Sequence, residues 1–205
     1  MMSMTKTIAL AAAITAGTAM TAGAAVLDFM TYANATEKGV DNGTVINFDG
    51  LDVSFNSSHY AYFDGGNAGL GVCKVLTSTK QCSPSSDDNV TDGESVTIGF
   101  DVAQTLSDLK FRAEGHVPLA DARTLLFGIN GGSLMEYTFA ALSTLSFQNV
   151  LSATFAFGGS NSDQFYVQSA TATPAPVPLP GAAPLALAGL GAFGVMRRRQ
   201  SRKTV

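Results

Sequence analysis

Apolar and polar residues alternate along short segments of this chain. In Ser95–Phe100, the residues Val96, Ile98 and Phe100 occupy every second position. Because successive side chains of a β-strand point to opposite faces, this pattern predicts a strand with one buried face. Alternation, or enrichment in β-branched and aromatic residues, also predicts strands over Thr44–Phe48, Leu51–Phe55, His59–Phe63, Leu106–Ala113, Thr124–Ile129, Leu134–Phe139, Ser143–Val150, Ala153–Phe157 and Gln164–Ser169.

Turn-forming residues separate these segments. Asp49-Gly50, Asp92-Gly93 and Asn130-Gly131-Gly132 are typical of tight turns between strands. About nine strands in roughly 145 residues predict an all-β fold, namely an antiparallel two-sheet β-sandwich similar to a jelly roll. Any helix in this part is expected to be short, and Ala140–Leu145 is the candidate.

The N-terminal segment has the order of features that is typical of an export signal. Lys6 provides a positive charge, an apolar run begins at Ile8, and small residues occupy Ala22 and Ala24. We expect cleavage after Ala24 or, as second choice, after Ala25. The apolar run is rich in alanine, threonine and glycine, which makes it too weak for a stable membrane span.

Three kinds of segment follow one another at the C-terminal end. Four prolines between Ala170 and Pro180 favour an extended spacer. The 18 residues from Leu179 to Met196 carry no charge and would span about 27 Å as a helix, close to the thickness of the hydrocarbon core. The basic cluster Arg197, Arg198 and Arg199 is expected to stay in the cytoplasm and to stop translocation.

The predicted organisation follows from these segments. It comprises a signal peptide over residues 1–24, a β-sandwich ectodomain over 25–170, a proline-rich linker with a sorting motif over 171–181, a transmembrane helix with the arginine cluster over 182–199 and a cytoplasmic tail over 200–205. The two ends agree on one topology, with the domain outside and the tail inside.

The C-terminal segment resembles a known family. Val177, Pro178, Leu179 and Pro180, a Gly/Ala/Leu span and the arginine cluster resemble the VPLPA-CTERM branch of the PEP-CTERM sorting domains. Gly181 stands where that family has alanine. The resemblance implies that an exosortase, a membrane-embedded cysteine transpeptidase, recognises Val177–Gly181 and cuts nearby. A plain membrane anchor is the alternative interpretation.

Charge is distributed unevenly. All 16 acidic residues lie between Asp28 and Asp163, and six of the 12 basic residues lie in the same segment, which therefore carries a formal charge of −10. Such a segment repels phosphate groups, so no nucleic-acid partner is expected. It would attract divalent cations, although solubility alone explains the same charge.

Export makes the two cysteines informative. Cys73 and Cys82 are separated by eight residues, and in an oxidising compartment a close pair predicts a disulfide. The residues around these cysteines, Asn67–Cys73 and Cys82–Asn89, are similar to a recurring arrangement in PEP-CTERM ectodomains of unknown function. That resemblance implies a secreted β-sandwich and no activity.

A polar loop offers candidate metal ligands. Carboxylate and amide oxygens at close spacing in a turn-rich segment suit calcium, and neighbouring loops would add Asp64 or Asp101. The candidate ligands are Asp87, Asp88, Asn89, Asp92 and Glu94. Their spacing differs from the EF-hand pattern, and a solvated acidic turn explains the same residues. Both interpretations stay open, and no other cofactor is expected.

Aromatic residues near Asp64-Gly65-Gly66 offer a candidate sugar site. The rings of Tyr60 and Tyr62 would stack on a sugar and Asn67 would bind hydroxyls, although a core strand is the simpler explanation. His59 and His116 lack the sequence context of a hydrolase triad, so no catalytic residue and no enzymatic activity are predicted.

The sequence therefore predicts an exported, non-enzymatic cell-surface or extracellular-matrix protein. Its expected partners are signal peptidase, an exosortase and the inner membrane. The alternative is a calcium-dependent module that binds extracellular polysaccharide.

Overall fold

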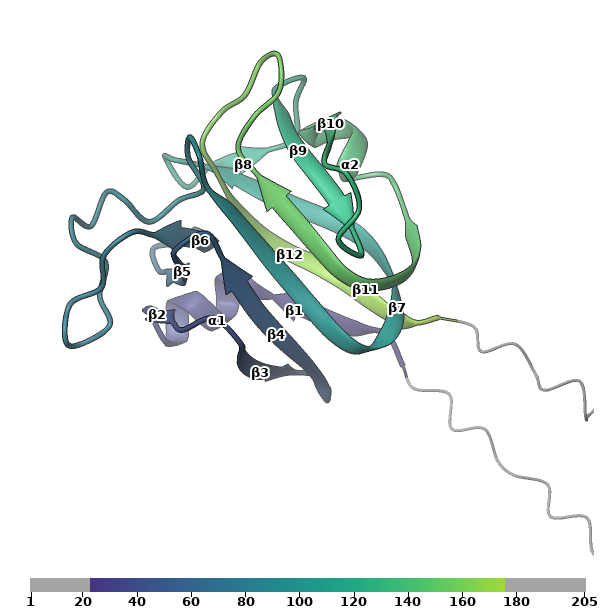
Figure 1. Cartoon of the computed structure of the whole chain (residues 1–205), viewed down its shortest axis with the longest axis horizontal. Coiled ribbons are helices and arrows are strands. Elements are labelled where there is room, and N and C mark those ends of the chain that lie inside the picture. Colours follow the sequence, from purple (N-terminus) through teal and green to yellow (C-terminus); the bar gives the residue numbers. More distant parts are fainter. Residues whose placement is uncertain (1–22, 176–205) are drawn as a thin grey trace, which may run out of the picture.

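A computed structural model describes residues 23–175 of the chain (Figure 1). The elements in this part are β1 (Ala25–Asp28), α1 (Phe29–Ala35), β2 (Lys38–Val40), β3 (Thr44–Phe48), β4 (Leu51–Ser57), β5 (Tyr60–Asp64), β6 (Gly69–Cys73), β7 (Ser95–Ala113), β8 (Pro118–Leu119), β9 (Thr124–Ile129), β10 (Met135–Thr138), α2 (Phe139–Leu142), β11 (Phe147–Ala156) and β12 (Phe165–Pro174). The prediction of an all-β domain with antiparallel strands is confirmed.

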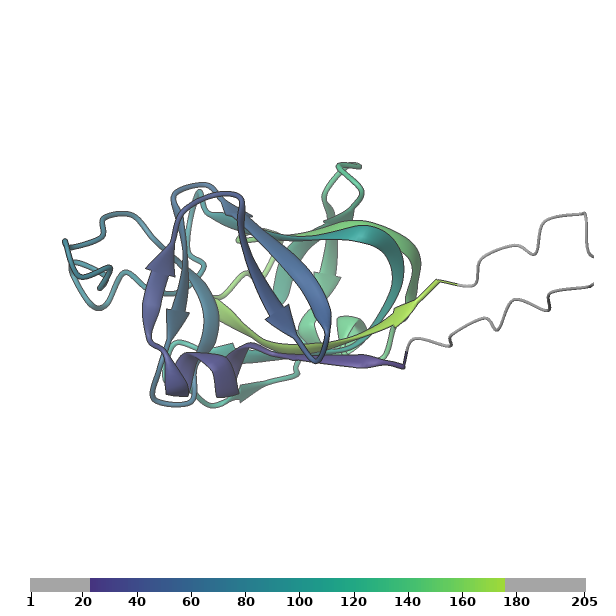
Figure 2. The same ribbon diagram turned by 90° about the horizontal axis from the view of Figure 1, so that it is seen from below.

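The strands form one hydrogen-bonded sheet, and the prediction of two separate sheets is not confirmed. The main path runs β10-β9-β11-β7-β12-β6-β5-β2, and β1, β3, β4 and β8 attach beside it. The strongly curved strand β7 passes from one layer of the domain into the other, as Figure 2 shows. This strand therefore joins the two layers into one sheet.

The two halves of β7 have different neighbours on one edge. Val96–Phe100 pairs with β4, whereas Gln104–Ala113 pairs with β12. On its other edge, β11 follows β7 from Ser95 to Leu106. Hydrogen bonding is therefore continuous where the sequence suggests a gap between two strands.

Local irregularities explain why β7 looks like two strands in the sequence. Val102 is exposed although its position in the alternation would bury it, and Asp108 has a φ of 51°. The register with β12 shifts at this second point. Such bulges bend a strand and increase its twist. Likewise, the predicted segments Ser143–Val150 and Ala153–Phe157 contribute to a single strand, β11, which contains Asn149 with a φ of 57°.

Two short helices pack against the strands of the sheet. The Asp28 side chain caps α1 by accepting a 2.9 Å hydrogen bond from the Thr31 amide. In α2, Thr138 performs the same function for the Ala141 amide at 3.1 Å. The helix predicted over Ala140–Leu145 thus exists but is shorter and begins at Phe139.

Phenylalanines fill the core in two groups. In one group, Phe29 of α1 contacts Phe48 and Phe55 with ring centroids 5.4 and 5.9 Å apart. In the other, Phe111 contacts Phe139 at 5.1 Å. Edge-on contacts of this kind add about 0.5–1.5 kcal/mol each to simple burial. α1 and α2 therefore each supply a buried aromatic ring to the sheet.

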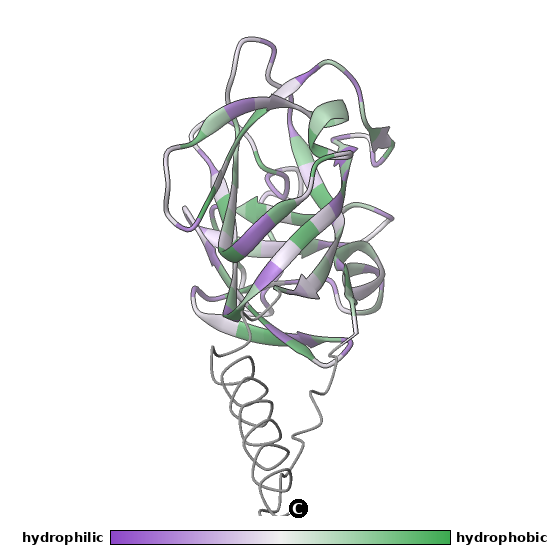
Figure 3. Cartoon of the chain, turned by 90° about the vertical axis from the view of Figure 1, so that its right-hand side faces the viewer, coloured by the Kyte–Doolittle hydropathy of each residue, from purple (hydrophilic) through white to green (hydrophobic). Residues whose placement is uncertain are grey.

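Both ends of the described chain lie at one corner of the domain (Figures 1 and 3). The reason is the antiparallel pairing of β1 with β12, in which Ala25 lies opposite Ala172. β12 continues to Pro174, so the folded domain extends four residues into the segment assigned to the linker. The predicted signal helix and transmembrane helix lie outside residues 23–175, and within that range no helix has the length and apolar character needed to cross a membrane.

Candidate functional site

The two predicted cysteines form a disulfide. The sulfur atoms of Cys73 and Cys82 are bonded, and their Cα atoms are 5.7 Å apart. The bond closes the first part of the long connection between β6 and β7. Tyr62 and Leu76 pack against it in a small cluster that is separate from the main core. The prediction of a structural disulfide is confirmed.

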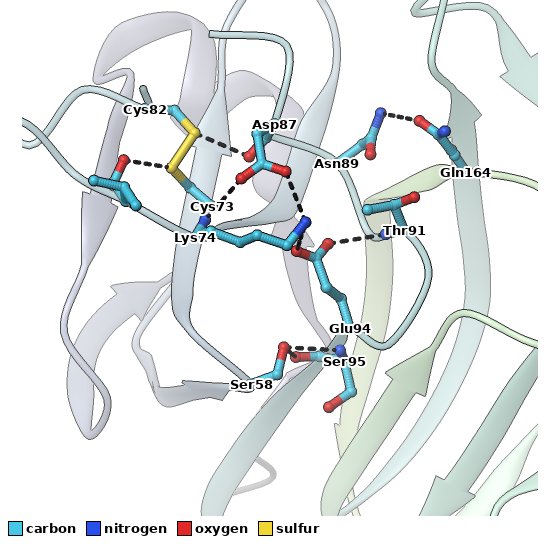
Figure 4. A network of polar contacts seen from close by, with 11 residues as sticks. Ser58, Cys73, Lys74, Cys82, Asp87, Asn89, Thr91, Glu94, Ser95 and Gln164 are labelled. Atoms are coloured by element: carbon cyan, nitrogen blue, oxygen red, sulfur yellow. Dashed lines mark hydrogen bonds and ion pairs between the residues drawn. A yellow bond between two sulfur atoms is a disulfide. The ribbon is translucent and has the colours of Figure 1, made fainter. Parts of the chain in front are cut away.

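A lysine occupies the position among the predicted calcium ligands where a cation would be needed (Figure 4). The Lys74 ammonium lies 2.9 Å from Asp87 Oδ1 and 3.1 Å from Glu94 Oε1. The side chain of Glu94 is fully buried, and its other oxygen accepts a 3.0 Å hydrogen bond from the Thr91 amide. Burial raises the pKa of Glu94, and the Thr91 amide and Lys74 oppose this effect. Lys74 thus supplies the positive charge that these two carboxylates require.

The remaining predicted ligands point to other partners. The Tyr166 hydroxyl donates to Asp88 Oδ1 at 2.5 Å, and the Asn89 amide donates to Gln164 Oε1 at 2.8 Å. Asp92 is exposed in the turn before β7. Across residues 23–175, no group of three or more His, Cys, Asp or Glu side chains is arranged to hold a metal ion. The calcium site stays a prediction, and its proposed ligands do not converge on one point.

The predicted sugar-binding residues are also separated. Tyr62 is 2% exposed, and its hydroxyl donates to Glu37 Oε1 at 3.0 Å, so its ring is not available for stacking. Tyr60 begins β5, whereas Asn67 lies in the turn after that strand. The Asn67 side-chain oxygen accepts a 3.1 Å hydrogen bond from Asn34. Sugar binding therefore stays a prediction, and the ring of Tyr62 is too buried to contribute to it.

The fold instead assembles a polar cluster that the sequence did not reveal. Asp64 ends β5, Asp88 lies in the β6–β7 connection, His116 lies in the β7–β8 turn and Tyr166 belongs to β12. Asp64 Oδ2 lies 3.1 Å from His116 Nε2. The His116 ring meets the Tyr166 ring edge-on with centroids 5.4 Å apart. We call these four residues the Asp64 cluster.

The contact of His116 with Gly66 identifies one ring nitrogen as a hydrogen-bond donor. Its Nδ1 lies 2.9 Å from the carbonyl oxygen of Gly66, and because a carbonyl only accepts, Nδ1 carries a proton. Nε2 lies close to Asp64 Oδ2, which makes no hydrogen bond within the described part of the chain. His116 has a φ of 56°, an unusual conformation for a side-chain-bearing residue, and the hydrogen bond to Gly66 helps to hold it there.

Burial dominates the electrostatics of the Asp64 cluster. Asp64 is 7% exposed, and this desolvation, together with the nearby charge of Asp88, raises its pKa to about 7, while His116 opposes the rise. Burial also raises the pKa of Asp88. The pKa of the Tyr166 hydroxyl is raised by burial and by its hydrogen bond to Asp88. Burial thus disfavours the charged forms of both carboxyl groups in the cluster.

No sequence signal joined these four residues. They come from four connections and strands spread between Asp64 and Tyr166, and none follows a recognised motif. The one available hint was the pair of glycines, Gly65 and Gly66, after Asp64. A side chain at Gly66 would approach the His116 ring to 3.2 Å, so the close contact requires a small residue here.

Comparison with known proteins identifies the C-terminal segment. Residues 176–200 match the family model described as the PEP-CTERM protein-sorting motif. No curated protein matches the chain significantly, and no solved structure does. The match begins directly after Ala175 and includes the predicted Val177–Gly181 motif and the Arg197–Arg199 cluster, both of which lie outside the described residues. The chain therefore carries the C-terminal sorting motif of the PEP-CTERM proteins.

Proposed function

We propose that this chain is an exported, non-enzymatic surface or extracellular-matrix protein that an exosortase processes near Val177–Gly181. The signal peptide starts translocation, the C-terminal segment holds the chain in the inner membrane, and processing then passes the β-domain to the cell surface or matrix. In this scheme the specific chemistry belongs to the processing enzymes, and the domain is their cargo.

The sorting-motif match carries this proposal. It covers residues 176–200 and begins immediately after the folded domain, whose last described hydrogen bond runs from the Ala175 amide to the Ala103 carbonyl at 3.0 Å. A motif placed directly outside a folded domain is accessible to an enzyme without unfolding of that domain. The position of the match thus supports a processing signal.

The disulfide gives independent support for export. Cys73 and Cys82 are bonded, and disulfides persist in oxidising compartments such as the bacterial periplasm. The bond also closes the first part of a connection that has little regular structure between Lys74 and Val90. Folding of this region therefore benefits from an environment outside the cytoplasm.

The internal pairing of polar groups supports a non-enzymatic role. Lys74 is engaged by Asp87 and Glu94, and His116 is engaged by Asp64 and the Gly66 carbonyl. These contacts stabilise the long connections of the domain.

Calcium-dependent polysaccharide binding stays the alternative function. Calorimetry with calcium and matrix glycans tests it, because the absence of heat with both ligands contradicts it.

Intact masses of the protein from membrane and extracellular fractions of its native host test the main proposal. We expect a species that begins at Ala25 or Val26 and ends within Val177–Gly181. The Pro178→Ala/Pro180→Ala variant should lose C-terminal processing, because it alters the motif. The matched control is Pro174→Ala, which changes a proline of β12 three residues before the motif and should be processed normally.

One result of the mass measurement would contradict processing by an exosortase. A wild-type species that keeps residues 197–205 and occurs only in the membrane fraction would show that the C-terminal segment is a permanent anchor. The domain would then remain at the outer face of the inner membrane.

A further inference from the structure

A pocket of about 250 Å³ lies beside the start of β1. Residues from four separate segments line it, among them Ala25 of β1, Asp49 of the β3–β4 turn, Gln104 of β7 and Pro174 of β12. Strand pairing explains why they meet, because β12 pairs with β1 at Ala172 and with β7 at Pro174. The pocket is therefore located where the first strand of the domain begins.

A buried acceptor in this pocket has no donor. Gln104 is 3% exposed, and its Nε2 donates a 2.9 Å hydrogen bond to the Val102 carbonyl, which fixes the orientation of the amide. The other amide atom, Oε1, is buried and makes no hydrogen bond within residues 23–175. Because buried polar atoms in folded proteins are nearly always hydrogen-bonded, this oxygen requires a donor.

The same pocket contains an exposed carboxylate. Asp49 Oδ2 accepts a 3.3 Å hydrogen bond from the Val26 amide. None of the ion pairs within the described part of the chain includes Asp49. The pocket thus combines a negative charge with a neutral acceptor. An ammonium group, which has three donors and a positive charge, is the ligand that this combination favours.

The expected signal-peptidase cut would create an ammonium group at this position. Hydrolysis of the Ala24–Ala25 peptide bond consumes one water molecule, leaves a carboxylate on Ala24 and frees the amine of Ala25, which is mostly protonated at neutral pH. Successive backbone nitrogens are about 3.6 Å apart in an extended chain, so the Ala25 nitrogen lies within about 7 Å of Asp49 Oδ2. A cut after Ala25 would place the amine on Val26, whose nitrogen is already 3.3 Å from that oxygen.

We propose that this pocket binds the new N-terminus of the processed chain. Before the cut, the Ala25 nitrogen is an uncharged amide with one proton. After the cut, the ammonium pairs with the Asp49 carboxylate, which a side-chain rotation brings to it, and donates to Gln104 Oε1. Removal of the leader thus holds β1 against the β3–β4 turn and β7. This inference rests on the proposed function, because it needs the export cut.

Labelling of the α-amine tests this site. The mature protein is purified from its native host, treated briefly at pH 7 with acetic anhydride in the folded state and then digested. Mass spectrometry identifies the N-terminal peptide and measures its labelled fraction. Only the unprotonated amine reacts, so an amine whose ammonium form is stabilised by a carboxylate is labelled about three- to tenfold more slowly than one without this partner.

Two variants remove the two acceptors separately. Asp49→Asn removes the charge and keeps an oxygen for the Val26 amide, and asparagine tolerates the φ of 50° at this position. We expect its α-amine to be labelled about three- to tenfold faster than that of the wild type. Gln104→Met removes the neutral acceptor at similar side-chain length and should increase the rate at least about twofold. The matched control is Asp52→Asn, which removes an exposed carboxylate of the same hairpin that does not line the pocket and should keep the wild-type rate.

The outcomes separate the inference from the proposed function. Equal labelling of the wild type and Asp49→Asn overturns the inference, and so does an unchanged rate in Gln104→Met. Formation of the Cys73–Cys82 bond, measured by thiol labelling, verifies that each variant was exported and folded. If Gln104→Met does not fold, the Asp49→Asn comparison decides. A purified wild type whose N-terminal peptide begins before Ala25 contradicts the proposed function itself.

Discussion

At the residue scale, Lys74 places a positive charge beside two carboxylates of the acidic loop. The sequence between Asp87 and Glu94 is rich in carboxylates, and the calcium prediction depended on this composition. The structure shows that Lys74, which lies 13 residues before Asp87, supplies the charge from the end of β6. Local composition cannot reveal this, because the compensating charge comes from another part of the chain.

The Lys74→Met variant should be less stable than the wild type. Glu94 Oε1 makes no hydrogen bond within the described residues, so removal of the ammonium leaves this buried carboxylate without its nearby positive charge, which costs about 1–3 kcal/mol. Urea denaturation at pH 7 measures this loss. The matched control is Lys80→Met, because Lys80 pairs with the exposed Asp41, and such a surface pair contributes about 0–1 kcal/mol. Equal effects of the two substitutions would contradict the assigned role of Lys74.

The Asp64 carboxyl should make the domain less stable as the pH rises. Its pKa is raised from 3.8 to about 7 in the folded state, so the folded state binds this proton more tightly than the unfolded state does. The resulting stabilisation is complete below about pH 4 and is lost as the pH rises through 7. The free energy of unfolding should therefore fall between pH 5 and pH 8, by about 1 kcal/mol per pH unit at the steepest point.

The Asp64→Asn variant isolates this contribution. Its free energy of unfolding should depend less steeply on pH, and the remaining fall should come from Asp88 and Glu94, whose pKa values are also raised by burial. The control Asp41→Asn changes an exposed carboxylate and should keep the wild-type pH dependence. A slope that is unchanged in Asp64→Asn would show that this carboxyl is ionised alike in both states.

At the scale of elements, regular segments could be predicted and irregular ones could not. β3 and β9 have the predicted bounds. β7 was predicted as two strands because the polar residue Gln104 interrupts the apolar alternation between Phe100 and Leu106, and the phase of burial changes only later, at Asp108. β1 and β2 were missed because four and three residues are too few for a periodicity.

The helix α1 was missed although the sequence contains its signals. Asp28 is a favourable N-cap residue, and Phe29 and Ala33 have the i, i+4 spacing of a buried helix face. The segment is only seven residues long and follows the signal region, so its pattern is brief. Its ring contacts with Phe48 and Phe55, which lie later in the chain, stabilise it in the fold.

Removal of the disulfide should destabilise the domain measurably. The Cys73→Ser/Cys82→Ser variant frees a loop of about ten residues in the unfolded state, which corresponds to a loss of about 2–3 kcal/mol in the chain-entropy model. The urea midpoint should fall, and hydrogen exchange should increase first in the connection between β6 and β7. An unchanged midpoint would mean that packing of Tyr62 and Leu76 alone holds this connection.

At the scale of the whole molecule, the sequence predicted the class of fold but not which strands pair with one another. Alternating segments and turn residues identify antiparallel strands, whereas the choice of partners depends on contacts between distant segments. The pairing of β1 with β12 joins the first and last strands of the domain, and the passage of β7 between layers turns two expected sheets into one. The Asp64 cluster also depends on contacts between distant segments, because its four members come from four separate segments.

The course of β12 also determines how the domain would respond to a mechanical load. A pull applied at Ala175 acts along the axis of a ten-residue strand that is paired with β7 over most of its length. Hydrogen bonds in an antiparallel pair lie perpendicular to the strands, so such a load shears them together instead of opening them one by one. A domain tethered through its C-terminal end would therefore resist extension better than one pulled apart at β1, whose four residues would peel away first.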